Sequence, residues 1–184
     1  MSITPALTRP NRLRGFTLIE LMVTIAVLAI LLAVAVPSFQ RASMNARLSA
    51  QTNELIASLK EARSEAARRG VFVAVRANSE EKGFNDGWKV FVGDGKTEAD
   101  ESTVVVRVVE ALPASITLTR TDADFADSSA EDKDYVTFGP RGQATVGYFR
   151  VCSSMPDMAG RGITLTTTGK VSVVASGISC STSP

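Results

Sequence analysis

Histidine is absent from this chain of 184 residues, and its absence removes whole classes of site. Without an imidazole there is no serine–histidine nucleophile pair and no histidine-ligated metal centre. No other acid and base stand together in a recognisable catalytic context. The sequence therefore predicts a protein that is not an enzyme and that needs no cofactor and no metal.

An excess of charge of either sign is also missing, because 20 lysines and arginines face 19 aspartates and glutamates. Residues 1–15 hold Arg9, Arg12 and Arg14 and no acid; without this segment, 17 basic side chains face 19 acidic ones. A chain so close to neutral has no global electrostatic attraction to nucleic acid. Its length, with no internal repeat, leaves room for one globular domain after a long helix.

One long apolar run is what the sequence does have. Residues 14–37 read RGFTLIELMVTIAVLAILLAVAVP, in which Gly15 and Phe16 precede an apolar stretch with a single carboxylate, Glu20. As a helix, residues 16–39 would be about 36 Å long, which is enough to cross a bilayer core of about 30 Å. Basic residues before the span place its N-terminal end in the cytoplasm and the remainder outside. A charge within such a span is costly and usually has a partner.

Two plainer interpretations of this run are a cleaved secretory signal and a simple membrane anchor. Residues 33–35, Ala-Val-Ala, would pass for a secretory cleavage site. The apolar core of a cleaved secretory signal is usually shorter than this run, however, and does not contain polar residues such as Glu20 and Thr24. Neither interpretation explains the junction between Gly15 and Phe16 or the carboxylate, so both are disfavoured.

The basic leader, the Gly15–Phe16 junction, Glu20, and Pro37 twenty-one residues after Phe16 together form a specific pattern. In these features the segment resembles the class III signal of type IV pilins and type II secretion pseudopilins. The resemblance implies that a prepilin peptidase cuts after Gly15 and that the new N-terminal Phe16 is methylated. It also implies a single-pass inner-membrane protein, with its domain in the periplasm, which then joins other minor and major pilins in a filament.

Glu20 is the residue to which this resemblance gives an assembly role. In the family, the matching glutamate pairs with the N-terminal amine of its own or of a neighbouring subunit. Cleavage would leave the amine of Phe16 in an apolar environment, where an unpaired charge is heavily penalised and a paired one sets register. The helix dipole also favours a carboxylate in the first turn, so a simple capping acid remains an open alternative.

The helix is predicted to continue over residues 38–69. Its apolar positions recur at steps of seven, four, three and four, which places them on one face. These positions are Leu48, Leu55, Leu59, Ala62 and Ala66. Arg68 and Arg69 fall in the last turn, and Gly70 stands where a helix stops. Pro37, inside the long helix, is expected to bend or locally unwind it.

After Gly70, the sequence predicts an all-β domain. Asn85-Asp86-Gly87 is turn-forming and predicts a hairpin before the second strand. The expected strands are residues 71–76, 88–92, 103–110, 116–120, 135–138, 146–152, 162–168 and 170–175. The predicted fold is α+β, a long N-terminal helix, membrane-spanning in its first half, packed on an antiparallel β-sheet. The predicted divisions are residues 1–15 as a cleaved leader, 16–37 as membrane or filament-core helix, 38–69 as its second half, and 70–184 as the β-rich domain.

The β-rich part carries a narrower resemblance. Its motifs are Gly87-Trp88-x-Val90-Phe91, Phe138-x-Pro140-x-Gly142 and Gly169-Lys170-Val171. These motifs resemble the GspH/FimT group of minor pilins, which includes secretion pseudopilins and pilus subunits of the FimT and FimU kind. The similarity extends over nearly the whole chain after the leader.

The chain has two cysteines, Cys152 and Cys180, so only one intramolecular pairing exists. Both lie in the part expected to be exported, where oxidation is favoured. We therefore predict a disulfide between them, with two buried free thiols as the alternative. A late disulfide of this kind resembles FimU/FimT-like pilus subunits more than secretion pseudopilins.

DNA binding is a further alternative, because FimT-like minor pilins of some competent bacteria bind DNA through a Gly-Arg-x-Arg signature. The matching stretch here, residues 169–172, reads Gly-Lys-Val-Ser and so keeps one cation and loses the second. Lys170 and Arg161, on neighbouring predicted strands, are the candidate DNA contacts. Arg141 and Arg150 could contribute to a local basic patch with Arg161, although the sequence does not show that these residues share a face. Phosphate binding depends on the number of cations engaged, so DNA binding is not favoured.

An acidic loop over residues 122–134 is the remaining candidate site. It lacks the spacing and the glycine of a calcium-binding loop, so a solvated loop is favoured. Taken together, the sequence predicts a minor pilin that joins a type IV pilus filament and supports its assembly or initiation. A type II secretion pseudopilin of the GspH kind and a DNA receptor for uptake are the alternatives.

Overall fold

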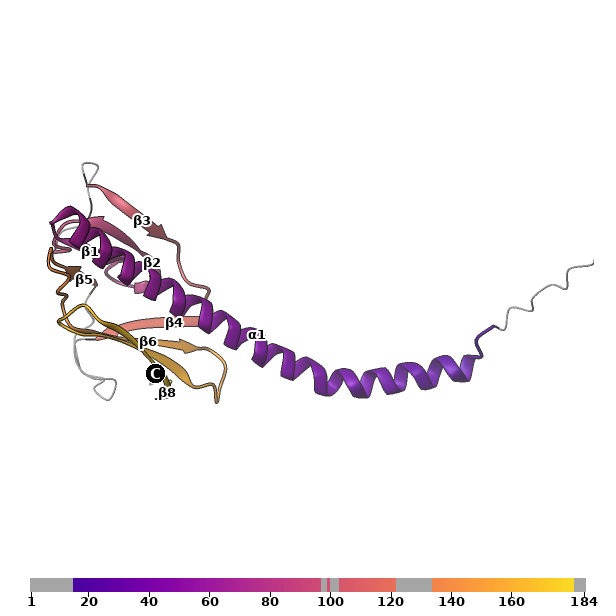
Figure 1. Cartoon of the computed structure of the whole chain (residues 1–184). Helices are drawn as coiled ribbons and strands as arrows, with labels where there is room; N and C mark the ends of the chain where they lie inside the picture. The colour runs from indigo at the N-terminus through magenta and orange to yellow at the C-terminus, as the bar shows by residue number, and fades with distance from the viewer. Residues whose placement is uncertain (1–14, 97–98, 100–102, 122–133, 181–184) are drawn as a thin grey trace, which may run out of the picture. The chain divides into compact units, whose positions relative to one another are not determined.

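The computed structural model describes residues 15–96, 99, 103–121 and 134–180. Within these residues, one helix is followed by eight strands (Figure 1). The helix α1 spans Leu18–Arg69. The strands are β1 Val73–Ser79, β2 Gly83–Val92, β3 Val105–Val109, β4 Ile116–Thr121, β5 Tyr135–Phe138, β6 Gly147–Ser153, β7 Gly160–Leu165 and β8 Val171–Ile178. Each predicted strand is confirmed, and the largest difference in bounds is at the start of β2.

The chain divides into two compact units, residues 1–42 and 43–184. In the first unit every described side chain is exposed, and this part of α1 is long and apolar enough to cross a bilayer. The helix passes through Pro37 without interruption, so the proline does not unwind it, and the expected bend stays a prediction. One residue later, the hydroxyl of Ser38 donates to the carbonyl of Val34 at 3.2 Å.

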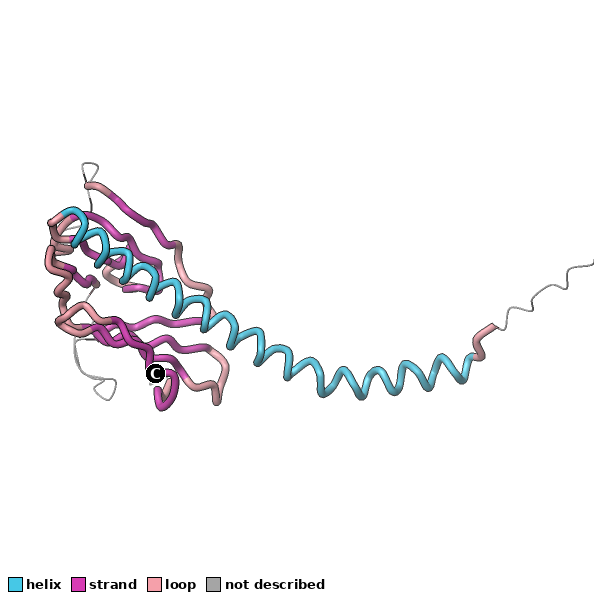
Figure 2. Tube along the Cα trace, viewed as in Figure 1, coloured by secondary structure: helices cyan, strands magenta, loops and turns pink. Residues whose placement is uncertain are grey.

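In the second unit, the remainder of α1 buries one face against the strands (Figure 2). The residues predicted for that face, Leu48, Leu55, Leu59, Ala62 and Ala66, are all buried, which confirms the stripe. Sequence reasoning missed Ser58, a buried hydroxyl on the same face that accepts a hydrogen bond of 3.0 Å from the indole of Trp88. The helix ends as predicted at Gly70, which has φ +69° and donates to the carbonyl of Ala66 at 2.9 Å.

The predicted α+β fold, a long helix packed on antiparallel β structure, is confirmed, and the strands form two four-stranded sheets, a division that the sequence did not predict. Their orders are β3-β2-β1-β5 and β4-β6-β7-β8, and β2 lies against β4 where the sheets meet. The second unit has one core cluster, to which α1 and both sheets contribute. In it, the ring of Phe84 in β2 lies edge-on to Phe149 in β6, with centroids 5.4 Å apart.

The turn between β1 and β2 lies at residues 80–82, so its predicted position at Asn85-Asp86-Gly87 is wrong. Ser79 pairs with Gly83 across this turn, and the register then shifts, which places Asn85-Asp86-Gly87 in a bulge within β2. Gly87 has φ +83°, and a Cβ there would collide with the backbone at the end of β3. A bulge and a tight turn both favour glycine at positive φ, so the same sequence signal fits either.

Asn85, in this bulge, connects the two sheets. Its carbonyl accepts from the amide of Leu112 at 2.9 Å, and its side-chain oxygen accepts from the amide of Leu118 in β4 at 2.8 Å. A side-chain amide has both donors and an acceptor, so it can replace backbone hydrogen bonds where strands do not pair. The bulge therefore holds the edge of the second sheet against the first.

Candidate functional site

The start of α1 presents the predicted assembly residues. Thr17 precedes the first helical residue, and its hydroxyl accepts from the backbone amide of Glu20 at 3.3 Å. This is one half of a capping box, a Thr-x-x-Glu pattern in which the glutamate would return a second hydrogen bond. The Glu20 carboxylate is exposed and makes no hydrogen bond or ion pair with any residue that the structure describes. The helix is thus capped by Thr17, and the Glu20 carboxylate takes no part in the cap formed by the described residues.

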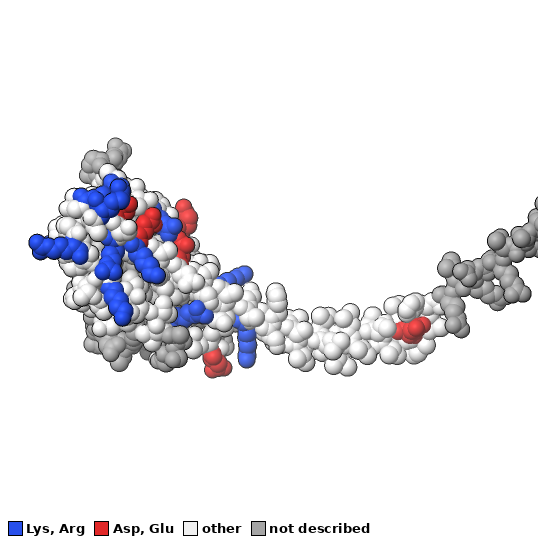
Figure 3. Space-filling model, viewed as in Figure 1, with Lys and Arg blue, Asp and Glu red and all other residues white. Residues whose placement is uncertain are grey.

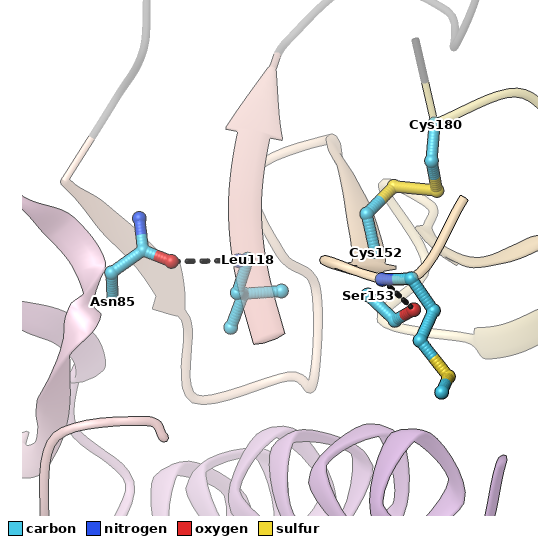
Figure 4. The surroundings of a disulfide bond; sticks show 6 residues. Asn85, Leu118, Cys152, Ser153 and Cys180 are labelled. Atoms are coloured by element: carbon cyan, nitrogen blue, oxygen red, sulfur yellow. Dashed lines mark hydrogen bonds between the residues drawn. A yellow bond between two sulfur atoms is a disulfide. The ribbon is translucent and has the colours of Figure 1, made fainter. Parts of the chain in front are cut away.

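The predicted disulfide between Cys152 and Cys180 is confirmed (Figure 4). Cys152 lies in β6, Cys180 lies just after β8, and their Cα atoms are 5.6 Å apart. In the sheet, β7 lies between these two strands, so the bridge has to pass over β7. It does so at Gly160, which pairs with Ile178 and where an added Cβ would meet both sulfur atoms. The bridge therefore depends on the absence of a side chain at Gly160.

Replacing Gly160 by alanine should destabilise the domain by about 1–3 kcal/mol, because the methyl group would overpack the site against the disulfide. Urea unfolding followed by the fluorescence of Trp88, the single tryptophan, measures the loss. Gly139→Ala is the matched control, since the nearest atoms to its Cβ belong to the side chain of Gln143, which can move. An equal effect of the two substitutions would contradict this account of Gly160.

The two candidate DNA contacts, Lys170 and Arg161, lie near opposite ends of the β7–β8 hairpin, and their role in DNA binding stays a prediction. Lys170 lies at the turn of the β7–β8 hairpin, next to the pair formed by Leu165 and Val171. Arg161 lies near the opposite end of β7. Four residues of extended strand separate Arg161 from Leu165, a distance of about 13 Å. Arg161 instead donates to the side chain of Asn45 on α1 at 3.0 Å. In an antiparallel hairpin, a residue beside the turn and a residue at the far end of the neighbouring strand are separated by the length of that strand.

Lys170 lies beside a different set of cations. It lines a hollow of about 520 Å³ together with Arg141 and with two cations of α1, Lys60 and Arg63. The other lining residues are Ser64, Ala67, Gly142, Gly169 and Val171. We call this feature the basic hollow. Of the basic residues that the sequence proposed, Lys170 and Arg141 are therefore brought together, while Arg150 lies in β6 and does not line the hollow.

Two glycine turns form one wall of the basic hollow. Gly142 and Gly169 have φ of +77° and +72°, and a Cβ on Gly169 would collide with the carbonyl of Gly142. The side chain of Arg63 lies against both glycines and donates to the carbonyl of Thr168 at 3.0 Å. Larger residues at these two positions would separate the turns and displace the guanidinium. The arrangement holds one of the four cations in a fixed place.

The domain half of α1 has charges of opposite sign on its two flanks. The acidic flank, Glu54, Glu61 and Glu65, follows a spacing of seven and four residues, and the basic flank contains Lys60 and Arg63. The acidic flank is compensated within the domain. Arg107 of β3 forms ion pairs of 3.2 and 3.0 Å with the two earlier glutamates. Hydrogen bonds from Arg68 and then Arg69 lower the pKa of Glu65 to about 2.

The basic flank, in contrast, has no such compensation. None of the four cations of the basic hollow forms an ion pair with a residue in the described part of the chain. Basic side chains gather over the domain on the face drawn in Figure 3. The sequence offered one signal for this feature, because positions 60, 63, 64 and 67 share a helix face. It gave no sign that Arg141 and Lys170, which come from separate loops, lie beside Lys60 and Arg63 of α1.

The acidic loop proposed from the sequence as a calcium candidate lies almost entirely outside the described residues, which omit 122–133. Elsewhere, in the ranges that the structure describes, no group of three or more Cys, Asp or Glu side chains could hold a metal ion.

Comparison with known protein families covers both parts of the chain. A family model described as Type II transport protein GspH matches residues 51–169, which is most of the chain. The chain belongs to the GspH family. A second model, described as Prokaryotic N-terminal methylation motif, matches residues 10–36 and so includes Gly15, Phe16 and Glu20. The GspH family comprises minor pilins and pseudopilins, as the resemblance implied.

Two crystal structures of one minor pilin share the fold of this GspH-family chain. The type IV minor pilin FimU of Pseudomonas aeruginosa PAO1, in space group P21, has a TM-score of 0.53 and 21% identity over 69% of this chain and 87% of its own. The same FimU in space group P65 has a TM-score of 0.52 and 20% identity, over 68% of this chain and 91% of the FimU chain. The minor pseudopilin EpsH of the Vibrio cholerae type 2 secretion system has a TM-score of 0.47 and 13% identity over 70% and 96%. A search among curated proteins found no match.

Membership in the GspH family has direct consequences for this chain. Proteins of the pilin family are structural subunits. The methylation motif implies processing by a prepilin peptidase and assembly with other pilins. Together with the apolar part of α1, it indicates membrane anchoring and incorporation into a pilus or pseudopilus.

Proposed function

We propose that this chain is a minor pilin of a type IV pilus filament, in which it supports assembly or initiation and catalyses no reaction. The observation that carries the proposal is the start of α1, where an exposed apolar helix is capped by Thr17 and leaves the Glu20 carboxylate unpaired among the described residues. A charged side chain in an apolar helix is expected to have a partner, and a carboxylate without one inside the chain is expected to find it in the assembled filament.

The proposed sequence of events follows from the chemistry of this segment. The chain waits in the inner membrane with its N-terminal end in the cytoplasm and its domain in the periplasm. Prepilin peptidase cuts after Gly15, and Phe16 becomes the methylated N-terminus. The amine of Phe16 and the carboxylate of Glu20, on the same or adjacent subunits, then pair as the helix leaves lipid for the filament core. Pairing offsets the cost of two charges in an apolar interior and fixes the register of the subunits.

A pseudopilin of a type II secretion system is the alternative, and the name of the matching family model points that way. The late disulfide and the fold shared with FimU support a pilus subunit instead. The neighbouring genes would separate the two, since minor-pilin genes and secretion genes are expected in different clusters. Deleting the gene should correspondingly abolish piliation in the first case and protein secretion in the second.

Processing is the direct test of the proposal. Intact mass of the chain extracted from membranes of its own host should show the loss of residues 1–15 and the gain of one methyl group. An N-terminus at Val36 would indicate ordinary secretion, and an uncleaved chain would indicate a simple anchor. In a host that lacks prepilin peptidase, the leader should be retained.

A further inference from the structure

We propose that the basic hollow is a docking site for an acidic segment of a neighbouring filament subunit. The proposal rests on the proposed function, since it requires the chain to stand beside other subunits. It assigns the recognition of that neighbour to four cations, Lys60, Arg63, Arg141 and Lys170, in a hollow that Ala67 and Val171 also line.

The first argument is charge. Several other cations of the domain, Arg68, Arg69, Arg76, Lys82 and Arg107, are paired with carboxylates within the chain. The four cations of the basic hollow have no carboxylate partner among the described residues, and they converge on one concavity. Four like charges held together repel one another, so an anion that enters the hollow removes this repulsion in addition to forming ion pairs.

The second argument is the asymmetry of α1. Glu54 and Glu61, next to the basic flank in sequence, are held on the other flank by Arg107. Glu65 is held by Arg68 and Arg69. The nearby acids of the helix are therefore engaged elsewhere and do not neutralise the basic hollow. Its partner has to come from another segment or another molecule.

The third argument is shape, which favours a peptide over a nucleic acid. A concavity of about 520 Å³ with Ala67 and Val171 among its lining residues accommodates side chains with apolar stems and charged ends, as glutamate has. Single-stranded nucleic acid is usually bound by aromatic stacking, and no aromatic residue lines the basic hollow. Duplex DNA is a convex rod whose phosphates are best met by cations spread along a surface.

The fourth argument is rigidity. The guanidinium of Arg63 is held by the carbonyl of Thr168, and it lies against the two glycine turns, which contact each other closely. A cation that is already in place loses little freedom on binding, so more of the interaction energy is realised as affinity. Arg63 is therefore the anchor of the proposed site, and Lys60, Arg141 and Lys170 complete it.

Photo-cross-linking in the host cell tests the proposal on the full chain. A photoreactive amino acid at Ser64, in the basic hollow, should cross-link to a segment of another filament subunit, and mass spectrometry of the joined peptides should identify that segment as acidic. The pair Arg141→Glu and Lys170→Glu should lower the yield on the order of tenfold. Lys89→Glu with Lys96→Glu makes the same change in charge outside the hollow and should leave the yield unchanged. Changing the acids of the partner segment to lysine should restore the cross-link to the Arg141→Glu and Lys170→Glu variant.

Several results would overturn the proposal. They are a cross-link to DNA, a cross-link to a neutral segment, and an equal loss of yield in the two pairs of variants. A second photoreactive residue at Leu28, in the apolar part of α1, separates this proposal from the proposed function. Cross-links to filament subunits from Leu28 but none from Ser64 would reject the docking site and keep the filament role. No cross-links from either position would reject both.

Discussion

Glu20→Ala should leave the β domain folded and remove the chain from the filament. The substitution deletes the only carboxylate in the apolar part of α1 and leaves the amine of Phe16 without a counter-ion in an apolar environment. Removing one partner of a buried ion pair costs about 3–5 kcal/mol, which corresponds to a fall of roughly 10²–10⁴-fold in the incorporated fraction. Helix capping should be unaffected, because Thr17 bonds to the backbone amide of Glu20 and not to its side chain.

The measurement is the amount of this chain in sheared filaments relative to the amount in the membrane. Thr24→Ala is the matched control, since its hydroxyl lies one turn further along and is bonded to the carbonyl of Leu21 within the helix. Intact mass should show normal cleavage of both variants, and a non-reducing gel should show that the disulfide still forms. Normal incorporation of a normally processed Glu20→Ala chain would show that the pairing is dispensable.

Cys152→Ser with Cys180→Ser should lower the free energy of unfolding of the domain by about 3–4 kcal/mol. The bridge closes a loop between residues 28 positions apart, and in the chain-entropy model the loss of such a loop constraint costs this amount. The effect should be concentrated on β8, which is an edge strand and has β7 as its one neighbour in the sheet.

Trp88 makes this stability measurable in the full chain, because it is the single tryptophan, lies fully buried, and donates to Ser58 of α1. Urea unfolding followed by its fluorescence should give a lower midpoint for the double variant, and the wild-type chain with reductant should match it. In the double-variant background, the cost of Gly160→Ala should shrink, since the sulfur atoms that it meets are gone. Equal midpoints with and without the disulfide would contradict the prediction.

The parts of the fold set by local periodicity were predictable. The buried stripe of α1 follows the helical repeat, and its end at Gly70 follows from the need for a positive φ after the last turn. The β strands follow from runs of β-branched and aromatic residues, of which residues 135–138 are an example with unchanged bounds. The disulfide was predictable because a chain with two cysteines has only one possible intramolecular pair.

The parts set by contacts between distant segments were not predictable. Asn85-Asp86-Gly87 carries turn chemistry, but its role as a bulge depends on the end of β3, against which Gly87 packs. The division into two sheets depends on which strands pair, and periodicity identifies strands without their neighbours. The proximity of Lys170 to Arg63 depends on two glycine turns that meet in space and lie far apart in the sequence.

Asn85 has a consequence for how the domain opens. Because this one residue of β2 accepts hydrogen bonds from Leu112 and from Leu118 of β4, the outer edge of the second sheet cannot detach while the bulge keeps its shape. Hydrogen exchange at the Leu118 amide is therefore coupled to the opening of the other sheet. We therefore expect the two sheets to open together as one foldon, so that a load on either sheet is resisted by both.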